Sequence, residues 1–172
     1  AAYEAIRIAT QHMTPVILLS DGYIANGAEP WKFPKSDDLP EIKISFAENT
    51  LAEGEKFMPY QRDEKLARPW AIPGTKGLEN RVGGLEKQDI TGNISYDSEN
   101  HQHMVKTRQA KVDLIANYIP EQTLDSGANK GKVLILGWGS TFGAIKSACN
   151  ELQKEGEEVS HAHLRYIRPF PK

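Results

Sequence analysis

The chain has 172 residues, of which 39% are hydrophobic and 26% charged, and its formal net charge is −2. This length and composition are typical of one ordinary globular domain or two small ones. The near balance of charge offers no electrostatic attraction to a nucleic-acid backbone or an anionic membrane surface. No run of apolar residues approaches the ~18 that a membrane-spanning helix needs. We therefore expect neither nucleic acid nor a membrane as a partner.

The chain contains a single cysteine, Cys149. This excludes an internal disulfide and also an iron–sulfur cluster held by this chain alone, because both need more than one thiolate. A lone thiol fits a reducing cytoplasm, which is the location that we expect. The sequence begins with neither Met nor a signal peptide, and we expect a fragment or a processed product.

The first twenty residues predict the end of a parallel α/β domain. Apolar residues recur at helical spacing in a helix that should stop near Pro15; they are Ala2, Ala5, Ile6, Ala9 and Met13. Residues 16–19 are then expected to form a strand that is buried on both faces. Because a parallel strand needs neighbours, the rest of its sheet is expected on the N-terminal side.

Asp21 follows the carboxyl end of this predicted strand. Open α/β sheets bind ligands at that edge, so Asp21 is a candidate to contact a ligand or a partner. The simpler interpretation is that its carboxylate caps the turn that ends the strand.

Residues 26–102 show no regular period and contain many prolines and glycines. A long irregular stretch inside a compact domain is typically a functional or interface segment. Its aromatic side chains predict that it packs on something, because disordered segments are poor in such residues. These aromatics are Trp31, Phe33, Phe57, Tyr60 and Trp70.

A long helix is predicted near residues 98–119. Asp97 or Ser98 can cap its start, and Pro120 ends it. The apolar residues at helical spacing predict a buried stripe; they are Val105, Val112, Ile115 and Ile119.

The polar side chains of this helix are expected at its surface. Lys106, Arg108 and Lys111 predict a basic, solvated face. His101 and His103 should project to different faces of the helix, and we interpret them as solvent or interface residues.

The clearest unit follows residue 126. A strand at 132–136, a glycine-rich turn at 137–143, a helix at 144–155 and a second strand at 159–167 predict a βαβ unit. Gly156 is well placed to stop the helix, and Cys149 lies on its buried face. One such unit does not make a stable domain, so a C-terminal remainder is expected.

The glycine-rich turn presents backbone N–H groups at a helix N-terminus, which makes it a natural anion site. Its candidate residues are Gly139, Ser140 and Thr141. The alternative is purely structural: Gly137 and Gly139 permit a tight turn, and Ser140 or Thr141 caps the helix.

The dinucleotide fingerprint is incomplete at this turn. Phe142 stands where the third glycine belongs, and Gly143 comes one position late. The second strand also ends in Arg-Tyr-Ile-Arg instead of an acidic residue. We favour the structural turn, and a nucleotide- or anion-binding module that uses residues 137–143 stays the alternative function.

Two histidines lie on the second predicted strand. His161 and His163 project from one face, a spacing that is compatible with metal binding. The sequence places no third ligand nearby, so we interpret them as satisfied histidines packed beside a neighbouring element. No Ser/His/Asp or Cys/His set with supporting spacing occurs either, and we expect no metal site and no catalytic residue in this chain.

Three stretches together resemble the alpha subunits of 2-oxoacid:ferredoxin oxidoreductases. The first is MTPVILLSDGY at residues 13–23, continuing to Glu-Pro-Trp at 29–31. The second is GTKGLENRVGGLEKQDITGNISYDSENHQHMVKTRQAKV at 74–112, which is most similar to the 2-oxoglutarate branch. The third is VLILGWGSTFGAIKSA at 133–148 with HLRYIRPFP at 163–171. One departure is Asn80, where the family pattern would have His.

The resemblance implies an α/β fold in three parts. Residues 1–34 would end a thiamine-pyrimidine-type parallel α/β domain. Residues 35–125 would be an irregular connector that includes the long helix. Residues 126–172 would be the first βαβ unit of a three-layer α/β domain of the transketolase C-terminal type.

The resemblance also implies a function. The family oxidatively decarboxylates a 2-oxoacid, here 2-oxoglutarate, to an acyl-CoA and passes the electrons to ferredoxin. Thiamine diphosphate and Mg²⁺ would serve the whole complex, with iron–sulfur clusters on partner chains. A beta subunit and, where the complex has them, gamma and delta subunits would be partners. The family's substrate-handling motifs, Tyr-Pro-Ile-Thr-Pro and Arg-Gly-Gly-Pro-Ser, do not occur here, so we expect an assembly role and no activity from the isolated chain.

Overall fold

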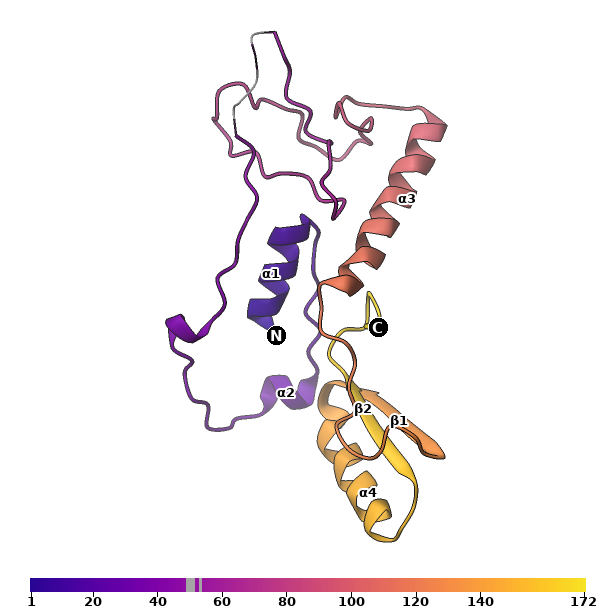
Figure 1. Cartoon of the computed structure of the whole chain (residues 1–172). Helices are drawn as coiled ribbons and strands as arrows, with labels where there is room; N and C mark the ends of the chain where they lie inside the picture. The colour runs from indigo at the N-terminus through magenta and orange to yellow at the C-terminus, as the bar shows by residue number, and fades with distance from the viewer. Residues whose placement is uncertain (49–51, 53) are drawn as a thin grey trace. The chain divides into compact units, whose positions relative to one another are not determined.

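The computed structural model describes residues 1–48, 52 and 54–172, which divide into two compact units (Figure 1). Unit 1 comprises Ala1–Ile17 and Lys35–Ile115, and unit 2 comprises Leu18–Pro34 and Ala116–Lys172. The chain therefore enters unit 2 twice. The mixture of helices with a small parallel sheet confirms the α/β class. None of the helices in these described ranges is long and apolar enough to cross a membrane.

Unit 1 begins with helix α1, Ala2–His12, which ends before Pro15 as predicted. The predicted buried face is wrong, because Ile6 is 55% exposed while Ile8 and His12 are buried. The irregular segment packs on a different face of α1 from the one that the apolar spacing predicted. Its Trp70 Nε1 donates a hydrogen bond of 2.8 Å to the carbonyl of Thr10.

The strand predicted at residues 16–19 is not formed. These residues have no regular secondary structure, and their four apolar side chains are exposed, Ile17 at 82% and Leu19 at 70%. A parallel strand exists only through hydrogen bonds to a neighbouring strand. Because none lies beside these described residues, the apolar run stays extended and uncovered.

The connector of unit 1 is irregular, as predicted, and contains the 3₁₀ turn η1, Ser36–Asp38. Isolated bridges join its distant parts, among them Phe46 with Trp70 and Tyr60 with Ile90. Tyr60 also packs beneath the guanidinium of Arg68, which lies 4.1 Å from its ring centroid. Packing of this kind confirms the expectation for the aromatics within unit 1.

Helix α3, Ser98–Leu114, continues as the 3₁₀ turn η2, Ile115–Asn117. Asp97 caps it, because its carboxylate accepts a hydrogen bond of 2.6 Å from the Asn100 amide. The predicted stripe is wrong at Val105, which is 42% exposed. Met104 and Lys111, seven residues apart on one face, are buried instead.

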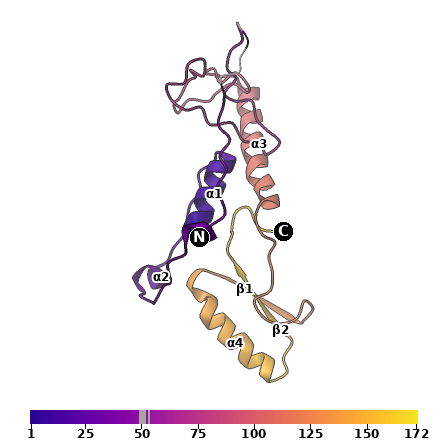
Figure 2. The ribbon, with the colours of Figure 1, turned by 60° about the vertical axis from the view of Figure 1, so that its left-hand side comes forward.

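Unit 2 contains the predicted βαβ unit. Strands β1, Val133–Trp138, and β2, Val159–Leu164, pair in parallel, with Val133 opposite Val159. Helix α4, Phe142–Lys154, packs against both strands (Figures 1 and 2). Cys149 is fully buried, and Gly156, at a φ of 90°, lies just beyond the end of the helix, as predicted.

Two short elements complete unit 2. The 3₁₀ turn η3, Gly139–Thr141, joins β1 to α4, and helix α2, Gly22–Asn26, belongs to the earlier visit of the chain to this unit. Both elements contribute residues to the candidate site.

Candidate functional site

The glycine-rich segment of residues 137–143 leads directly from strand to helix. The turn itself is η3, because Gly137, which was predicted to lie in the turn, belongs to β1 and Gly143 belongs to α4. Gly139 has a φ of 66°, in the left-handed region that favours glycine. The side-chain cap predicted for α4 is not formed, since the Thr141 hydroxyl donates instead to the carbonyl of Trp138 over 2.8 Å. The turn thus closes on its own backbone.

Asp21 and the turn, which were separate candidates in the sequence, come together in unit 2. The Ser140 amide donates a hydrogen bond of 2.9 Å to Oδ2 of Asp21. The Ile24 amide donates one of 3.0 Å to Oδ1, so the same carboxylate caps α2. Ile24 first and Ser140 next lower the pKa of Asp21, because both hydrogen bonds favour the ionised form.

His161 and His163 lie beside this turn. His163 contacts the Gly139 carbonyl through Nε2 at 3.0 Å, but its buried Nδ1 has no hydrogen-bond partner among the described residues, so the expectation of a satisfied histidine holds for one ring nitrogen only. His161 is fully buried, and neither of its ring nitrogens has a hydrogen-bond partner among the described residues, so the expectation is wrong there. Burial lowers the pKa of His161. Within the described ranges, no group of three or more His, Cys, Asp or Glu side chains could hold a metal ion.

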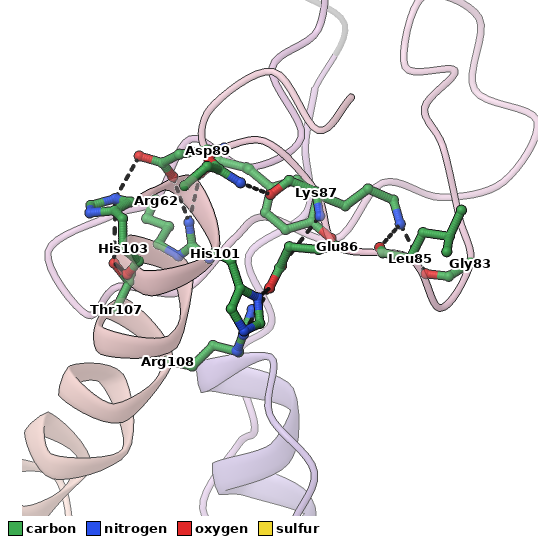
Figure 3. A network of polar contacts seen from close by, with 12 residues as sticks. Arg62, Gly83, Leu85, Glu86, Lys87, Asp89, His101, His103, Thr107 and Arg108 are labelled. Atoms are coloured by element: carbon green, nitrogen blue, oxygen red, sulfur yellow. Dashed lines mark hydrogen bonds and ion pairs between the residues drawn. The ribbon is translucent and has the colours of Figure 1, made fainter. Parts of the chain in front are cut away.

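A polar network in unit 1 fixes the connector to α3 (Figure 3). Arg108 donates from both terminal nitrogens to the two carboxylate oxygens of Glu86, each over 3.1 Å. His101 Nδ1 lies 2.8 Å from the same carboxylate. The Arg108 hydrogen bonds are the main cause that lowers the pKa of Glu86 to about 2. His101 is thus exposed, and it also contacts the connector through Glu86.

Asp89 forms the second half of this network. Its carboxylate lies 3.0 Å from Arg62 Nη1 and 3.0 Å from His103 Nε2. Asn100 of α3 joins the two halves, since its side chain accepts from the Asp89 amide and donates to the Lys87 carbonyl, both over 3.0 Å. The connector and the helix thus share one continuous set of polar contacts.

Two lysines are buried in unit 1. Lys87, 3% exposed, donates from Nζ to the carbonyls of Gly83 and Leu85 (Figure 3). Lys111 was predicted to be solvated, and this is wrong, since it is 9% exposed and donates over 2.9 Å to the Met13 carbonyl at the end of α1. Burial is the main cause that lowers the pKa of Lys111 to about 8.

The connector also encloses a hollow of about 560 Å³. Its walls combine aromatic, aliphatic and basic side chains, including Tyr60, Arg68, Trp70, Leu78, Arg81 and Val82. Val82 is 93% exposed, whereas Leu78 is buried. The hollow is thus an apolar surface with basic groups at its walls.

The pairing of Glu86 and Asp89 with α3 could not be predicted from the sequence. The contacts of their carboxylates with α3 span 14 to 22 residues, from an irregular segment to a helix. Neither the helical nor the strand period relates residues across such a break. The only available signal was the gathering of opposite charges in the two segments.

Comparison with known proteins gives sequence relatives that cover this chain almost completely. The alpha subunit of 2-oxoacid:ferredoxin oxidoreductase 1 from Aeropyrum pernix is 31% identical over 99% of the chain. The 2-oxoglutarate oxidoreductase subunit KorA from Mycobacterium tuberculosis is 52% identical, also over 99%. No protein-family model matches the chain. The chain belongs to the alpha subunits of the 2-oxoacid:ferredoxin oxidoreductases, and it spans about a quarter of the length of these relatives.

A solved structure is also similar to almost the whole of this chain. The 2-oxoglutarate:ferredoxin oxidoreductase from Magnetococcus marinus, with 2-oxoglutarate, coenzyme A and succinyl-CoA bound, matches with a TM-score of 0.80 and 26% identity. The match covers 96% of this chain and 28% of that one. Together with the KorA relative, it agrees with the branch that the connector sequence resembles.

Proposed function

We propose that this chain is a segment of the alpha subunit of a thiamine-dependent 2-oxoglutarate:ferredoxin oxidoreductase. The complete enzyme would oxidatively decarboxylate 2-oxoglutarate to an acyl-CoA and pass the electrons to ferredoxin. The observation that carries this proposal is the 52% identity to subunit KorA over 99% of the chain. The bound molecules named for the Magnetococcus marinus enzyme support the substrate and coenzyme A.

Within such a subunit, we infer that the segment runs across two domains. Residues 1–34 would end the pyrimidine-type domain, residues 35–125 would connect, and residues 126–172 would begin the transketolase C-terminal-type domain. The three resembling stretches, in the family's order, support this division.

The proposed role of the segment is assembly. Trp31 and Phe33 are 71% and 81% exposed and lie with their rings 5.1 Å apart. An exposed aromatic pair and the open hollow of unit 1 are the kind of surface that partner chains cover. A beta subunit is the partner that we propose, in a cytoplasmic complex.

The cofactors are proposed to be held elsewhere in the complex. The single thiol, Cys149, does not fit an iron–sulfur cluster, and its side chain is fully buried. Among the described residues, no group of three or more His, Cys, Asp or Glu side chains could hold a metal ion. No chemical step is therefore assigned to residues of this segment.

The test is to co-express a full-length alpha subunit that contains this sequence with its beta subunit. We expect co-purification of the two chains and reduction of a redox dye that requires both 2-oxoglutarate and coenzyme A. Pyruvate, and 2-oxoglutarate without coenzyme A, are the matched controls. An alpha subunit that purifies alone and reduces no dye with any 2-oxoacid would overturn the proposal.

A further inference from the structure

We propose that Asp21 is an internal anion that occupies the glycine-rich turn of residues 137–143, fastens residues 18–34 to unit 2 and keeps the turn closed to phosphate. This clasp concerns the residues of unit 2 alone and does not depend on the proposed enzymatic activity.

The clasp is a single carboxylate shared by two helix starts. Its Oδ1 accepts from the Ile24 amide at the start of α2, and its Oδ2 accepts from the Ser140 amide at the turn that leads into α4. The first N–H groups of a helix have no partner within the helix and attract an anion. A phosphate at this turn would need the Ser140 amide that Asp21 already holds.

Gly139 is fitted to this carboxylate. A Cβ at residue 139 would lie 3.1 Å from Oδ2 of Asp21, and its φ of 66° disfavours any other residue. The glycine therefore allows a carboxylate of the chain itself to approach, which is the role that a phosphate takes in dinucleotide-binding turns.

Gly143 does not serve as the third glycine of such a turn. In a dinucleotide site that glycine permits close packing of helix on strand. Here a Cβ on Gly143 would meet nothing within 4 Å. The turn thus has the glycine that allows an anion to approach, Gly139. It lacks the third glycine, which packs the helix on the strand in a nucleotide-binding site.

The position of Asp21 in the chain explains why the clasp would hold residues 18–34 on unit 2. The chain leaves unit 1 after Ile17 and returns to it at Lys35. Asp21 lies near the start of this excursion and is joined to Ser140, 119 residues later. Loss of the contact should loosen the excursion from unit 2 and leave the Ser140 amide open to another anion.

The test compares the chain with its Asp21→Ala variant by amide hydrogen exchange and by NMR titration with sodium phosphate. In the variant we expect a loss of protection of at least tenfold at Ser140 and Ile24. We also expect phosphate or formate to shift the Ser140 resonance and to restore part of its protection. In the unaltered chain, phosphate should leave this resonance in place.

Glu29→Ala is the matched control, since Glu29 is an exposed carboxylate of the same excursion. It should leave Ser140 unchanged, and the amides of β2 and of the second half of α4, in the same unit, report whether each variant is folded. If Asp21→Ala does not fold, Asp21→Asn provides the test. Its uncharged side-chain amide should protect the Ser140 N–H from exchange less than the carboxylate does. Unchanged protection in these variants, or a phosphate response at Ser140 in the unaltered chain, would overturn the proposal.

Discussion

Glu86 illustrates how one carboxylate can hold an irregular segment on a helix. Arg108 lowers its pKa to about 2 from an ordinary 4.5. The stabilisation is therefore present above pH 4.5 and is lost as the pH falls towards 2. We expect Glu86→Gln to lower the free energy of unfolding by about 1 kcal/mol at pH 7, a value reduced by the exposure of Arg108. Urea denaturation at pH 7 and pH 3 measures this difference.

The control for this prediction is Glu64→Gln, since Glu64 is exposed on the same unit. Its stability should follow that of the unaltered chain at both pH values. At pH 3 the deficit of Glu86→Gln should be smaller than at pH 7, because much of the native contribution is already lost. An equal deficit at both pH values would show that the ion pair is not its cause.

Lys111 should give a pH dependence of the same sign in a higher pH range. Burial lowers its pKa in the folded chain to about 8 from 10.5, so between these values the unfolded chain binds more protons. The stability contributed by this residue must therefore rise with pH across that window. Relative to Lys111→Met, the unaltered chain should gain up to about 3 kcal/mol between pH 7 and pH 10.5. Denaturation at both pH values measures it, and Lys106→Met, an exposed change on the same helix, should show no such gain.

The βαβ element contains two glycines whose replacement should act in opposite directions. A Cβ on Gly137 would overlap Cδ1 of Ile145 and lie 3.3 Å from Nδ1 of His163. Gly137→Ala should therefore cost about 1–2 kcal/mol by overpacking. Gly143→Ala, in α4 with free space around its Cβ, should stabilise by about 0.5–1 kcal/mol.

Thermal unfolding followed by circular dichroism compares the two glycine variants directly. Opposite shifts of the midpoint are expected, since only a Cβ on Gly137, in β1, would meet a side chain of α4. A Gly137→Ala variant as stable as Gly143→Ala would mean that the helix moves away from the strand without cost.

The helices and the βαβ unit could be predicted because their signals are local. Asp97 caps α3, and Gly156 follows α4, as their positions in the sequence indicate. The buried faces were less predictable. Ile6 and Val105 fit an apolar stripe but are exposed, because the irregular connector packs against other sides of the two helices. The spacing of apolar residues identifies a helix, but it does not determine which face of the helix the rest of the chain covers.

For the whole molecule, strand β1 leaves three large apolar side chains uncovered. Leu134, Leu136 and Trp138 alternate along β1 on the face away from Gly137, and their exposed fractions are 58%, 43% and 58%. Apolar patches of this kind drive association. We expect the chain to associate with rising concentration, and Leu134→Glu with Leu136→Glu to reduce this. Light scattering during size-exclusion chromatography measures the mass.

The control is Val82→Glu, an exposed change in unit 1, which should leave association through the sheet unaltered. Circular dichroism establishes that the double variant keeps its fold. A chain that stays monomeric at every concentration would contradict the prediction.

The sequence by itself determined the class of fold, the βαβ unit and the family. These depend on short-range periods, caps and ordered motifs, which are written in consecutive residues. Only the tertiary structure decided that Asp21 meets Ser140, that Glu86 meets Arg108 and that Lys111 is buried. Each of these contacts joins residues that no helical or strand period relates. These contacts arise because irregular segments fold back on helices and strands. The sequence of an irregular segment has no periodicity from which its path could be predicted.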